Sequence, residues 1–360
     1  FTRDVRSVGH YGTGKLEITI NNLVELEKAK PLIEKSLNHT PFDENKTLQK
    51  GEKTMLKRLI DTTARELTSY NKAELLTAIS DSEGRTLAAE TIGTVTPMLV
   101  NITNAEFVAS LGADLIMLNI FDVNDPIIQG LPQTSPEDTI REVKRLTGRM
   151  VAINLEPAVI KDGQEESVWN LTTGRQATAE NARKAADMGV DMIVLTGNPG
   201  VGVDNEAIIQ ALSRLKEAVG DRVILTAGKM HASGIISEAG EKILTEKDVE
   251  AFVDAGADVI LLPAPGTVPG ITMEYAGNLI RKAHEKGALA MTTIGTSQEG
   301  ADEATVCQIA LMCKMAGADI HHIGDSGYMG MALPENITAY SVAIRGKRHT
   351  YRRMAMSLLR

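Results

Sequence analysis

The chain has 360 residues, of which 43% are hydrophobic and only 3% aromatic, and its formal net charge is −9 at pH 7. This length allows one large domain or two ordinary ones, with an interior built from aliphatic side chains and methionine. The negative charge disfavours nucleic acid and anionic membranes as partners, and no apolar segment is long enough to cross a bilayer. With no signal peptide evident, we expect a cytoplasmic protein.

Residues 1–54 differ in pattern from the rest of the chain. Leu16–Ile20 predicts a short strand, Leu23–Leu37 a charged helix, and residues 40–54 a polar linker. We therefore divide the chain into a small appended αβ segment, residues 1–54, and a main domain, residues 55–360.

Two interpretations fit the junction between these parts. Lys50–Thr54, directly before Met55, can be encoded by a purine-rich ribosome-binding sequence. Met55 would then be the original start of the main domain, and the residues before it would be read through from an upstream gene. An ordinary charged linker explains the same residues.

In the main domain, glycine repeatedly separates an amphipathic segment from an apolar run. Examples are Gly112-Ala-Asp, Gly189-Val-Asp, Gly256-Ala-Asp and Gly317-Ala-Asp. Because glycine readily takes the left-handed conformation that ends a helix, each of these marks a helix-to-strand junction. The apolar runs are continuous, as expected for parallel strands covered on both faces.

Counting these runs predicts eight strands that alternate with helices, the pattern of an α/β protein with a (β/α)8 TIM barrel. An open doubly wound sheet is the alternative, but the residues after the first strand lack its G-x-G-x-x-G phosphate loop. Before the barrel, residues 55–80 predict a helical extension that closes the bottom of the barrel or reaches toward a neighbouring subunit. The strands are predicted at 86–91, 114–120, 150–155, 191–195, 222–227, 258–262, 288–294 and 318–323; the helices between them are predicted at 104–111, 136–146, 179–188, 205–219, 246–255, 272–286 and 301–316, with a last one from about Pro334.

In TIM barrels the active site lies at the C-terminal ends of the strands, which selects the candidates for proton transfer. Lys229 follows the fifth strand and is a candidate base, Schiff-base nucleophile or fixed positive charge. Glu90 and Glu156 follow the first and third strands and could act as acid and base. His231 lies just past Lys229 and is a further proton-transfer candidate. The structural alternative is that Lys229 pairs with one of these glutamates.

The loops after the last two strands are candidates for binding an anion. Both are bracketed by glycines and precede helices, so their backbone N–H groups and helix dipoles favour a phosphate or carboxylate. Ordinary turn and N-cap chemistry is the alternative, and Glu299 and Asp325 would repel phosphate unless they turn away or bind a metal. The candidate ligand-binding residues are Asn198, Gly295, Thr296, Ser297, His322, Gly324, Asp325 and Ser326.

A metal site is a further possibility at the same mouth. Glu90, Asp122 and Glu156 could together ligate Mg²⁺, the candidate cofactor, through carboxylate oxygens. The alternative is that the glutamates pair with Lys229 or Arg175. No Asp-x-Asp or His-rich spacing supports the metal interpretation.

The last strand and the last helix carry further polar residues. His321 and His322 are adjacent on a strand, so they point to opposite faces. His322 enters the barrel if it shares its face with Ile320, and His321 then packs against the last helix. The basic run Arg345–Arg353 indicates a solvated or subunit-facing helix rather than an RNA-binding patch. We expect a homo-oligomer.

Several long motifs carry a resemblance to a known family. They are Ser82-Glu-Gly-Arg-Thr, Asn154-Leu-Glu-Pro, Leu195-Thr-Gly-Asn-Pro-Gly, Ala227-Gly-Lys-Met-His, Leu261-Leu-Pro-Ala-Pro-Gly-Thr-Val-Pro-Gly, Ile294-Gly-Thr-Ser-Gln-Glu-Gly-Ala-Asp and His321-His-Ile-Gly-Asp-Ser-Gly-Tyr. Through them residues 55–360 resemble a bacterial TIM-barrel family whose members are labelled phosphoenolpyruvate phosphonomutase-like or haloacid-dehalogenase-like. The chain departs from the phosphonomutase pattern, because Asp325-Ser-Gly-Tyr follows the last strand and the cysteine loop of the lyase branch is absent.

Residues 1–39 carry a second resemblance. Val8-Gly-His-Tyr-Gly-Thr-Gly-Lys-Leu-Glu and Leu26-Glu-Lys-Ala-Lys-Pro-Leu-Ile-Glu-Lys are similar to the end of a domain of unknown function in predicted transport proteins.

Three functions remain open. The first is an enzyme that acts on a small phosphorylated or carboxylated metabolite by proton abstraction or by carbon–carbon or carbon–phosphorus bond chemistry. The second is a non-catalytic anion-binding or assembly module, which an apolar plug in the barrel mouth would favour. The third is a magnesium-dependent phosphonomutase or lyase, which requires the candidate metal ligands to lie close together.

Overall fold

The computed structural model describes residues 2–4, 16–18, 56–158, 171–197, 203–231 and 240–360. The chain divides into two compact units, Phe1–Met55 and Leu56–Arg360. In the first unit, β1 (Thr2–Asp4) pairs antiparallel with β2 (Leu16–Ile18), which lies within the strand predicted there. The helix predicted at 23–37 lies outside the described residues.

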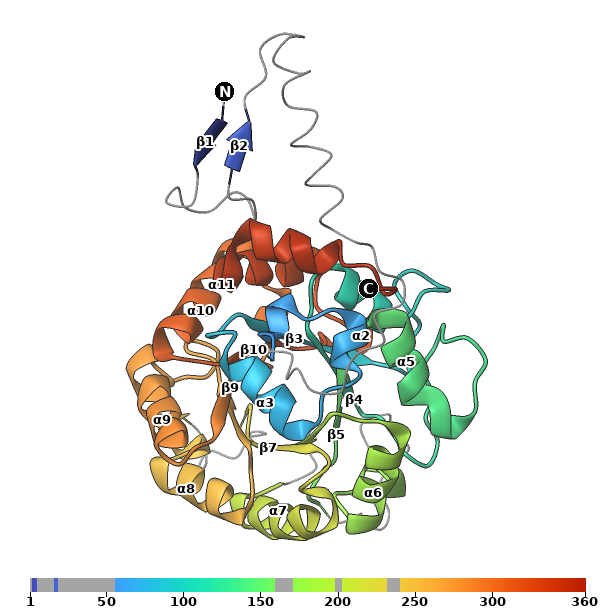
Figure 1. Ribbon diagram of the computed structural model, residues 1–360. Helices are drawn as coiled ribbons and strands as arrows, with labels where there is room; N and C mark the ends of the chain where they lie inside the picture. Colours follow the sequence, from blue (N-terminus) through green and yellow to red (C-terminus); the bar gives the residue numbers. More distant parts are fainter. Residues whose placement is uncertain (1, 5–15, 19–55, 159–170, 198–202, 232–239) are drawn as a thin grey trace. The chain divides into compact units, whose positions relative to one another are not determined.

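The second unit is a closed barrel of eight parallel strands, in which the last strand pairs with the first (Figure 1). This confirms the predicted (β/α)8 TIM barrel, and each predicted strand end lies within two residues of the observed one. The strands are β3 (Thr86–Ile92), β4 (Leu115–Asn119), β5 (Met150–Asn154), β6 (Met192–Leu195), β7 (Ile224–Gly228), β8 (Val259–Pro263), β9 (Leu289–Ile294) and β10 (Ile320–Ile323).

Most helices of the barrel begin at polar caps and several end at glycines, as their sequences predict. Thr103 and Thr245 each form a capping box at the start of a helix. Gly189, Gly256 and Gly317 each end a helix, with φ of +97°, +116° and +102°, a conformation that costs glycine least. The helices are α2 (Ala64–Leu67), α3 (Lys72–Ser80), α4 (Asn104–Ser110), α5 (Thr139–Thr147), α6 (Ala179–Met188), α7 (Asn205–Val219), α8 (Glu246–Ala255), α9 (Met273–Glu285), α10 (Glu303–Ala316) and α11 (Pro334–Met354).

Two apolar layers hold the barrel together. Outward-facing strand residues pack against the surrounding helices, whereas inward-facing ones fill the interior. Because strand side chains alternate between faces, every second residue of each strand is inside. The inner layer contains Ala88, Leu115, Met117, Met150, Ala152, Met192, Val194, Ile224, Val259, Leu261, Met291 and Ile320.

The helical extension closes one end of the barrel. Leu75, Ala78 and Ile79 of α3, with Leu59 and Leu67 before them, belong to the same inner cluster as the barrel interior. Figure 1 shows α3 lying across the end of the barrel. Of the two predictions for residues 55–80, closure of the barrel bottom is therefore confirmed.

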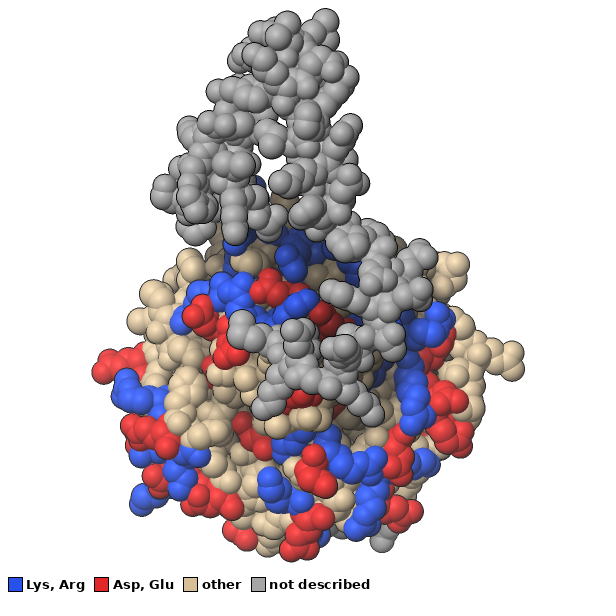
Figure 2. Space-filling model, in the orientation of Figure 1, with Lys and Arg blue, Asp and Glu red and all other residues tan. Residues whose placement is uncertain are grey.

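The surface on this side carries both signs of charge. Figure 2 shows Lys and Arg interspersed with Asp and Glu over the helices around the barrel. Across the described residues, no helix has the length and apolar character that a membrane span requires.

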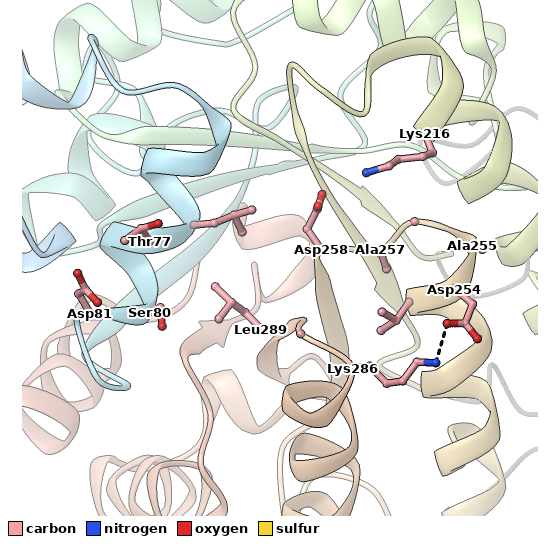
Figure 3. Close-up of a pocket in the computed structure, with 14 residues that line it drawn as sticks. Thr77, Ser80, Asp81, Lys216, Asp254, Ala255, Ala257, Asp258, Lys286 and Leu289 are labelled. Atoms are coloured by element: carbon pink, nitrogen blue, oxygen red, sulfur yellow. Dashed lines mark ion pairs between the residues drawn. The ribbon is translucent and has the colours of Figure 1, made fainter. Parts of the chain in front are cut away.

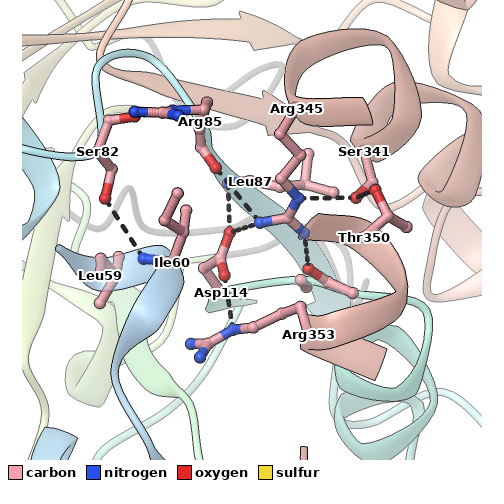
Figure 4. Close-up of polar contacts among 12 residues, drawn as sticks. Leu59, Ile60, Ser82, Arg85, Leu87, Asp114, Ser341, Arg345, Thr350 and Arg353 are labelled. Atoms are coloured by element: carbon pink, nitrogen blue, oxygen red, sulfur yellow. Dashed lines mark hydrogen bonds and ion pairs between the residues drawn. The ribbon is translucent and has the colours of Figure 1, made fainter. Parts of the chain in front are cut away.

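A buried ion cluster joins the last helix to the N-terminal ends of β3 and β4 (Figure 4). Asp114 lies 2.5 Å from Arg345 Nη1 and 2.7 Å from Arg353 Nε, and the three side chains are at most 1% exposed. The same carboxylate accepts the Leu87 N–H at 2.9 Å. Burial alone would raise the pKa of Asp114, but the two guanidinium groups hold it below its ordinary value.

The prediction that the run Arg345–Arg353 is solvated is wrong for both of its ends. Arg345 and Arg353 are buried, whereas Lys347 and Arg348 between them are exposed. Local sequence could not show this, because the counter-ion Asp114 lies 231 residues away from Arg345 in the chain.

We expect Asp114→Asn to destabilise the fold strongly, because it leaves buried arginines without a counter-charge. Breaking such a buried ion pair costs about 3–5 kcal/mol. Urea unfolding followed by circular dichroism measures the loss. The matched control is Asp187→Asn, whose ion pair with Arg222 is exposed and is worth less than about 1 kcal/mol. Equal losses in the two variants would contradict the role of the cluster.

Candidate functional site

The barrel interior becomes polar at the C-terminal ends of the strands. The last inward-facing residues there form what we call the mouth layer, and each is at most 7% exposed. They replace the aliphatic residues that fill the barrel below them. The mouth layer consists of Glu90 on β3, Asn119 on β4, Asn154 on β5, Thr293 on β9 and His322 on β10.

His322 faces inward, as its alternation with Ile320 predicts. Ile320 belongs to the inner layer, and His322 lies two residues further along the same strand. His321 points outward, with its ring 5.7 Å from that of Tyr340 on α11 and its Nε2 3.1 Å from the Gly84 carbonyl oxygen. This confirms the predicted division of the two histidines.

Three buried acids and His322 form an acid cluster at the mouth. Glu90 is 4% exposed, and Glu299 and Asp325, from the loops after β9 and β10, are each 8% exposed. His322 Nε2 lies 3.4 Å from Glu90 Oε2. Asp325 Oδ2 accepts the Asn119 amide N–H at 2.8 Å, which ties the loop after β10 to the end of β4.

The acids of the cluster bind protons more tightly than they would in water. Burial, and then the negative charge of Glu299, raises the pKa of Glu90 to about 8. Burial, and then the charge of Glu90, raises the pKa of Asp325 to about 7. Burial also raises the pKa of Glu299, whereas it lowers the pKa of His322 to about 4. At neutral pH the cluster therefore holds a protonated Glu90 beside a neutral imidazole.

Glycine at position 324 allows the two loops to meet. A Cβ there would lie 2.8 Å from the Ile294 carbonyl oxygen and 3.6 Å from Glu299 Cδ. In the same loops Ser297 and Ser326 have positive φ, +83° and +58°, which is uncommon for residues other than glycine. The acids are thus brought together by a close loop contact and two strained turns.

The residues predicted to cradle an anion already make hydrogen bonds within their loops. Thr296 Oγ1 donates to the Thr267 carbonyl oxygen at 2.7 Å, and Gly300 N donates to the Ser297 carbonyl oxygen at 3.1 Å. Asp325 Oδ1 accepts the Gly327 N–H at 2.8 Å. Anion binding by these loops stays a prediction, and Asn198 lies outside the described residues.

Glu156 and Asp122 have partners that are not part of the acid cluster. Glu156 forms an ion pair with Arg175, and both side chains are at most 3% exposed. Asp122 accepts the Asn124 N–H at 2.7 Å and the Thr172 hydroxyl at 2.5 Å. Within the described ranges, no three His, Cys, Asp or Glu residues are grouped so that they could hold a metal ion.

Lys229 lies directly after β7 and is 5% exposed. Gly228 before it occupies the inward position of the strand, and a Cβ there would collide with the Leu261 carbonyl oxygen of β8. His231 follows, and burial lowers its pKa. The predicted lysine is thus buried at the mouth end of the barrel, one residue beyond a close strand contact.

A groove of about 610 Å³ lies at the opposite end of the barrel (Figure 3). Thr77 and Ser80 of α3 line it together with Asp258 and Leu289, which lie at the N-terminal ends of β8 and β9. Two of its acids have basic partners, since Lys286 Nζ lies 2.7 Å from Asp254 Oδ1 and Lys72 Nζ lies 2.6 Å from Asp258 Oδ2. This groove therefore lacks the buried acids that distinguish the mouth.

Asn119 and Glu299 belong to the mouth, although neither was predicted as a site residue. Asn119 donates to Asp325, and Glu299 raises the pKa of Glu90. The position of Asn119 at the inward end of β4 was a usable signal. The inward turn of Glu299 has no counterpart in the sequence pattern, because it depends on the contact between two loops.

Residues 60–360 match the family described as a domain of unknown function, DUF7916. The chain belongs to this family. Among curated proteins there is no significant match. Nothing in these matches supports the phosphonomutase-like or dehalogenase-like labels for this DUF7916 protein.

Solved structures similar to this DUF7916 protein include two kinds of enzyme. An archaeal fructose 1,6-bisphosphate aldolase has 13% identity and a TM-score of 0.48, over 76% of this chain and 99% of that one. Thiamine phosphate pyrophosphorylase from Pyrococcus furiosus has 11% identity and a TM-score of 0.41, over 73% of this chain and 96% of that one. These values leave the reaction of the DUF7916 protein open.

We expect Glu90→Gln to change how stability depends on pH. The pKa of Glu90 rises from 4.5 to about 8 on folding, so the stability that its protonated form contributes is full below pH 4.5 and is lost as the pH rises through 8. The amide does not titrate. The free energy of unfolding of the variant relative to the parent should therefore rise between these pH values, by up to about 1.4 kcal/mol per pH unit.

Urea unfolding at a series of pH values measures this difference. Glu217→Gln is the matched control, because it removes an exposed carboxylate on α7. A Glu90→Gln curve that runs parallel to that of the parent would show that Glu90 does not hold its proton in the folded protein.

Proposed function

We propose that this protein is an enzyme that transfers protons to and from a small phosphorylated or carboxylated metabolite at the C-terminal mouth of its barrel. The observation that carries the proposal is the acid cluster, in which Glu90, buried to 4% exposure, lies 3.4 Å from the neutral ring of His322. Buried acids whose pKa lies near neutral pH are suited to general acid–base catalysis.

In this proposal Glu90 exchanges a proton with the substrate. Its pKa of about 8 leaves the carboxyl protonated at pH 7, yet close enough to neutrality to release the proton during turnover. Asp325, with a pKa of about 7, and His322 are the groups beside it that can accept or relay that proton. The fraction of Glu90 that is ionised at pH 7 would take a proton from a carbon next to a carbonyl group, and the carbanion so formed would begin carbon–carbon or carbon–phosphorus bond chemistry.

Lys229 would hold the anionic group of the substrate or attack its carbonyl. The lysine lies at the mouth end of β7 and is 5% exposed, a place where its ammonium group is partly removed from water. Glu156 would act indirectly, by positioning Arg175 through their buried ion pair.

The polar mouth layer favours an enzyme over an assembly module. A barrel used only as a scaffold would be filled by apolar side chains at this end, as it is below. Here Glu90, Asn119 and Asn154 occupy these inward positions instead. A magnesium-dependent phosphonomutase or lyase has less support, because two of its candidate ligands have other partners. Glu156 forms an ion pair with Arg175, and Asp122 accepts a hydrogen bond from Thr172.

Proton abstraction can be tested by isotope exchange. The protein is incubated in D₂O with a panel of 2-oxo acids and sugar phosphates, and proton NMR follows the loss of hydrogens next to the carbonyl group. We expect exchange with at least one compound and a rate about 10²- to 10⁴-fold lower in Glu90→Gln. Glu217→Gln should exchange at the parental rate. Undiminished exchange in Glu90→Gln would remove this residue from the mechanism.

The same exchange assay can distinguish a nucleophilic role of Lys229 from a role in binding the anionic group of the substrate. Lys229→Met should abolish turnover while the folded far-UV spectrum is retained. Borohydride reduction in the presence of the exchanged compound traps a Schiff base on the parent protein if the lysine is a nucleophile. An absence of adduct, together with lost turnover in the variant, assigns Lys229 to charge binding, and unchanged turnover excludes it from the site.

A further inference from the structure

The buried acids of this protein differ in how their charge is balanced. Outside the acid cluster, acids with little exposure are paired with basic groups inside the fold. Asp114 is held by Arg345 and Arg353, Glu156 by Arg175, Asp191 by Lys144 and Asp258 by Lys72.

The acid cluster is the exception. In the part of the chain that the structure describes, no lysine or arginine forms an ion pair with Glu90, Glu299 or Asp325. His322, whose Nε2 lies 3.4 Å from Glu90 Oε2, is fully buried and neutral at pH 7. Three acids therefore face one another with no fixed positive charge between them.

Hydrogen-bond donors around the acids are nevertheless placed where they stabilise ionised carboxylates. Both oxygens of Asp325 accept N–H groups, one from the Asn119 side chain and one from Gly327, each at 2.8 Å. Glu90 accepts the backbone N–H of Asp325, and Glu299 accepts that of Ser297. Fixed donors of this kind stabilise the charged form of an acid.

Buried acceptor atoms in the cluster have no donor of their own. Glu90 Oε1 and Glu299 Oε2 are fully buried and accept no hydrogen bond, and neither ring nitrogen of His322 makes one. Asn154 Oδ1, also in the mouth layer, is likewise buried and accepts no hydrogen bond. Buried acceptors of this kind are costly unless a ligand satisfies them.

We infer that the ligand of this mouth carries a protonated amine that binds between Glu90, Glu299 and Asp325. An ammonium group supplies N–H donors for the two unsatisfied carboxylate oxygens, Glu90 Oε1 and Glu299 Oε2, and a positive charge that balances the acids. The inference rests on the proposed function, and it narrows the substrate to a small amino-bearing carboxylate or phosphate.

Binding of the amine would also prepare Glu90 for its proposed role. A positive charge beside the carboxyl lowers its pKa, which counteracts the burial that raises it to about 8. Glu90 would then lose its proton when the ligand arrives and act as a base. The acids would be neutralised by protons before binding and by the ligand after it.

Matched ligand pairs that differ only by an amine and a hydroxyl group test the inference. Glycine and glycolate, β-alanine and 3-hydroxypropionate, and glucosamine 6-phosphate and glucose 6-phosphate are compared by calorimetry and thermal shift on the full chain. We expect the amine of at least one pair to bind about 10- to 100-fold more tightly than its hydroxyl partner.

Variants locate the binding. Glu299→Gln and Asp325→Asn should each lose the preference for the amine. Glu299→Gln, which removes mutual repulsion, should also keep the melting temperature of the unliganded protein. Glu217→Gln, which removes one exposed carboxylate, should keep the preference. Circular dichroism confirms that each variant is folded.

Two outcomes would overturn the inference. One is the absence of an amine preference in every pair, and the other is stabilisation by MgCl₂ alone that the same variants abolish. Binding does not depend on turnover, so the two proposals fail separately. A retained amine preference without isotope exchange defeats only the proposed function, whereas exchange of 2-oxo acids with no amine preference defeats only this inference.

Discussion

Closure of the parallel sheet is the constraint on which the rest of this structure depends. Once β10 pairs with β3, alternate side chains of every strand must enter one enclosed interior. Aliphatic residues fill that interior along most of its length, and the last inward position of several strands is polar. Glu90, Asn119 and His322, which are far apart in the chain, meet only for this reason.

The charge of buried acids is balanced differently in the ion cluster around Asp114 and in the acid cluster at the mouth. At the N-terminal ends of the strands, Asp114 is neutralised by Arg345 and Arg353, and this ion cluster ties α11 to β3 and β4. At the mouth, Glu90 and Asp325 have no such basic partner among the described residues, and burial shifts their pKa values toward neutrality. The first arrangement stabilises the fold, and the second leaves titratable groups available for chemistry.

The fold could be predicted from local patterns, because the residues that indicate each strand and helix lie within it or next to it in the sequence. Glycines after helices and continuous apolar runs located all eight strands, and alternation along β10 placed His322 inside. Pairings between distant residues could not be predicted in this way. The burial of Arg345 depends on Asp114, and the inward turn of Glu299 depends on the loop contact that Gly324 permits.

The central claim is that burial keeps Glu90 protonated beside a neutral His322 in the unliganded protein. A neutron crystal structure at pH 7, grown from D₂O, locates these protons directly. The account predicts a deuterium on a carboxyl oxygen of Glu90 and a single deuterium on the ring nitrogens of His322. An ionised Glu90 facing a doubly protonated His322 would contradict it.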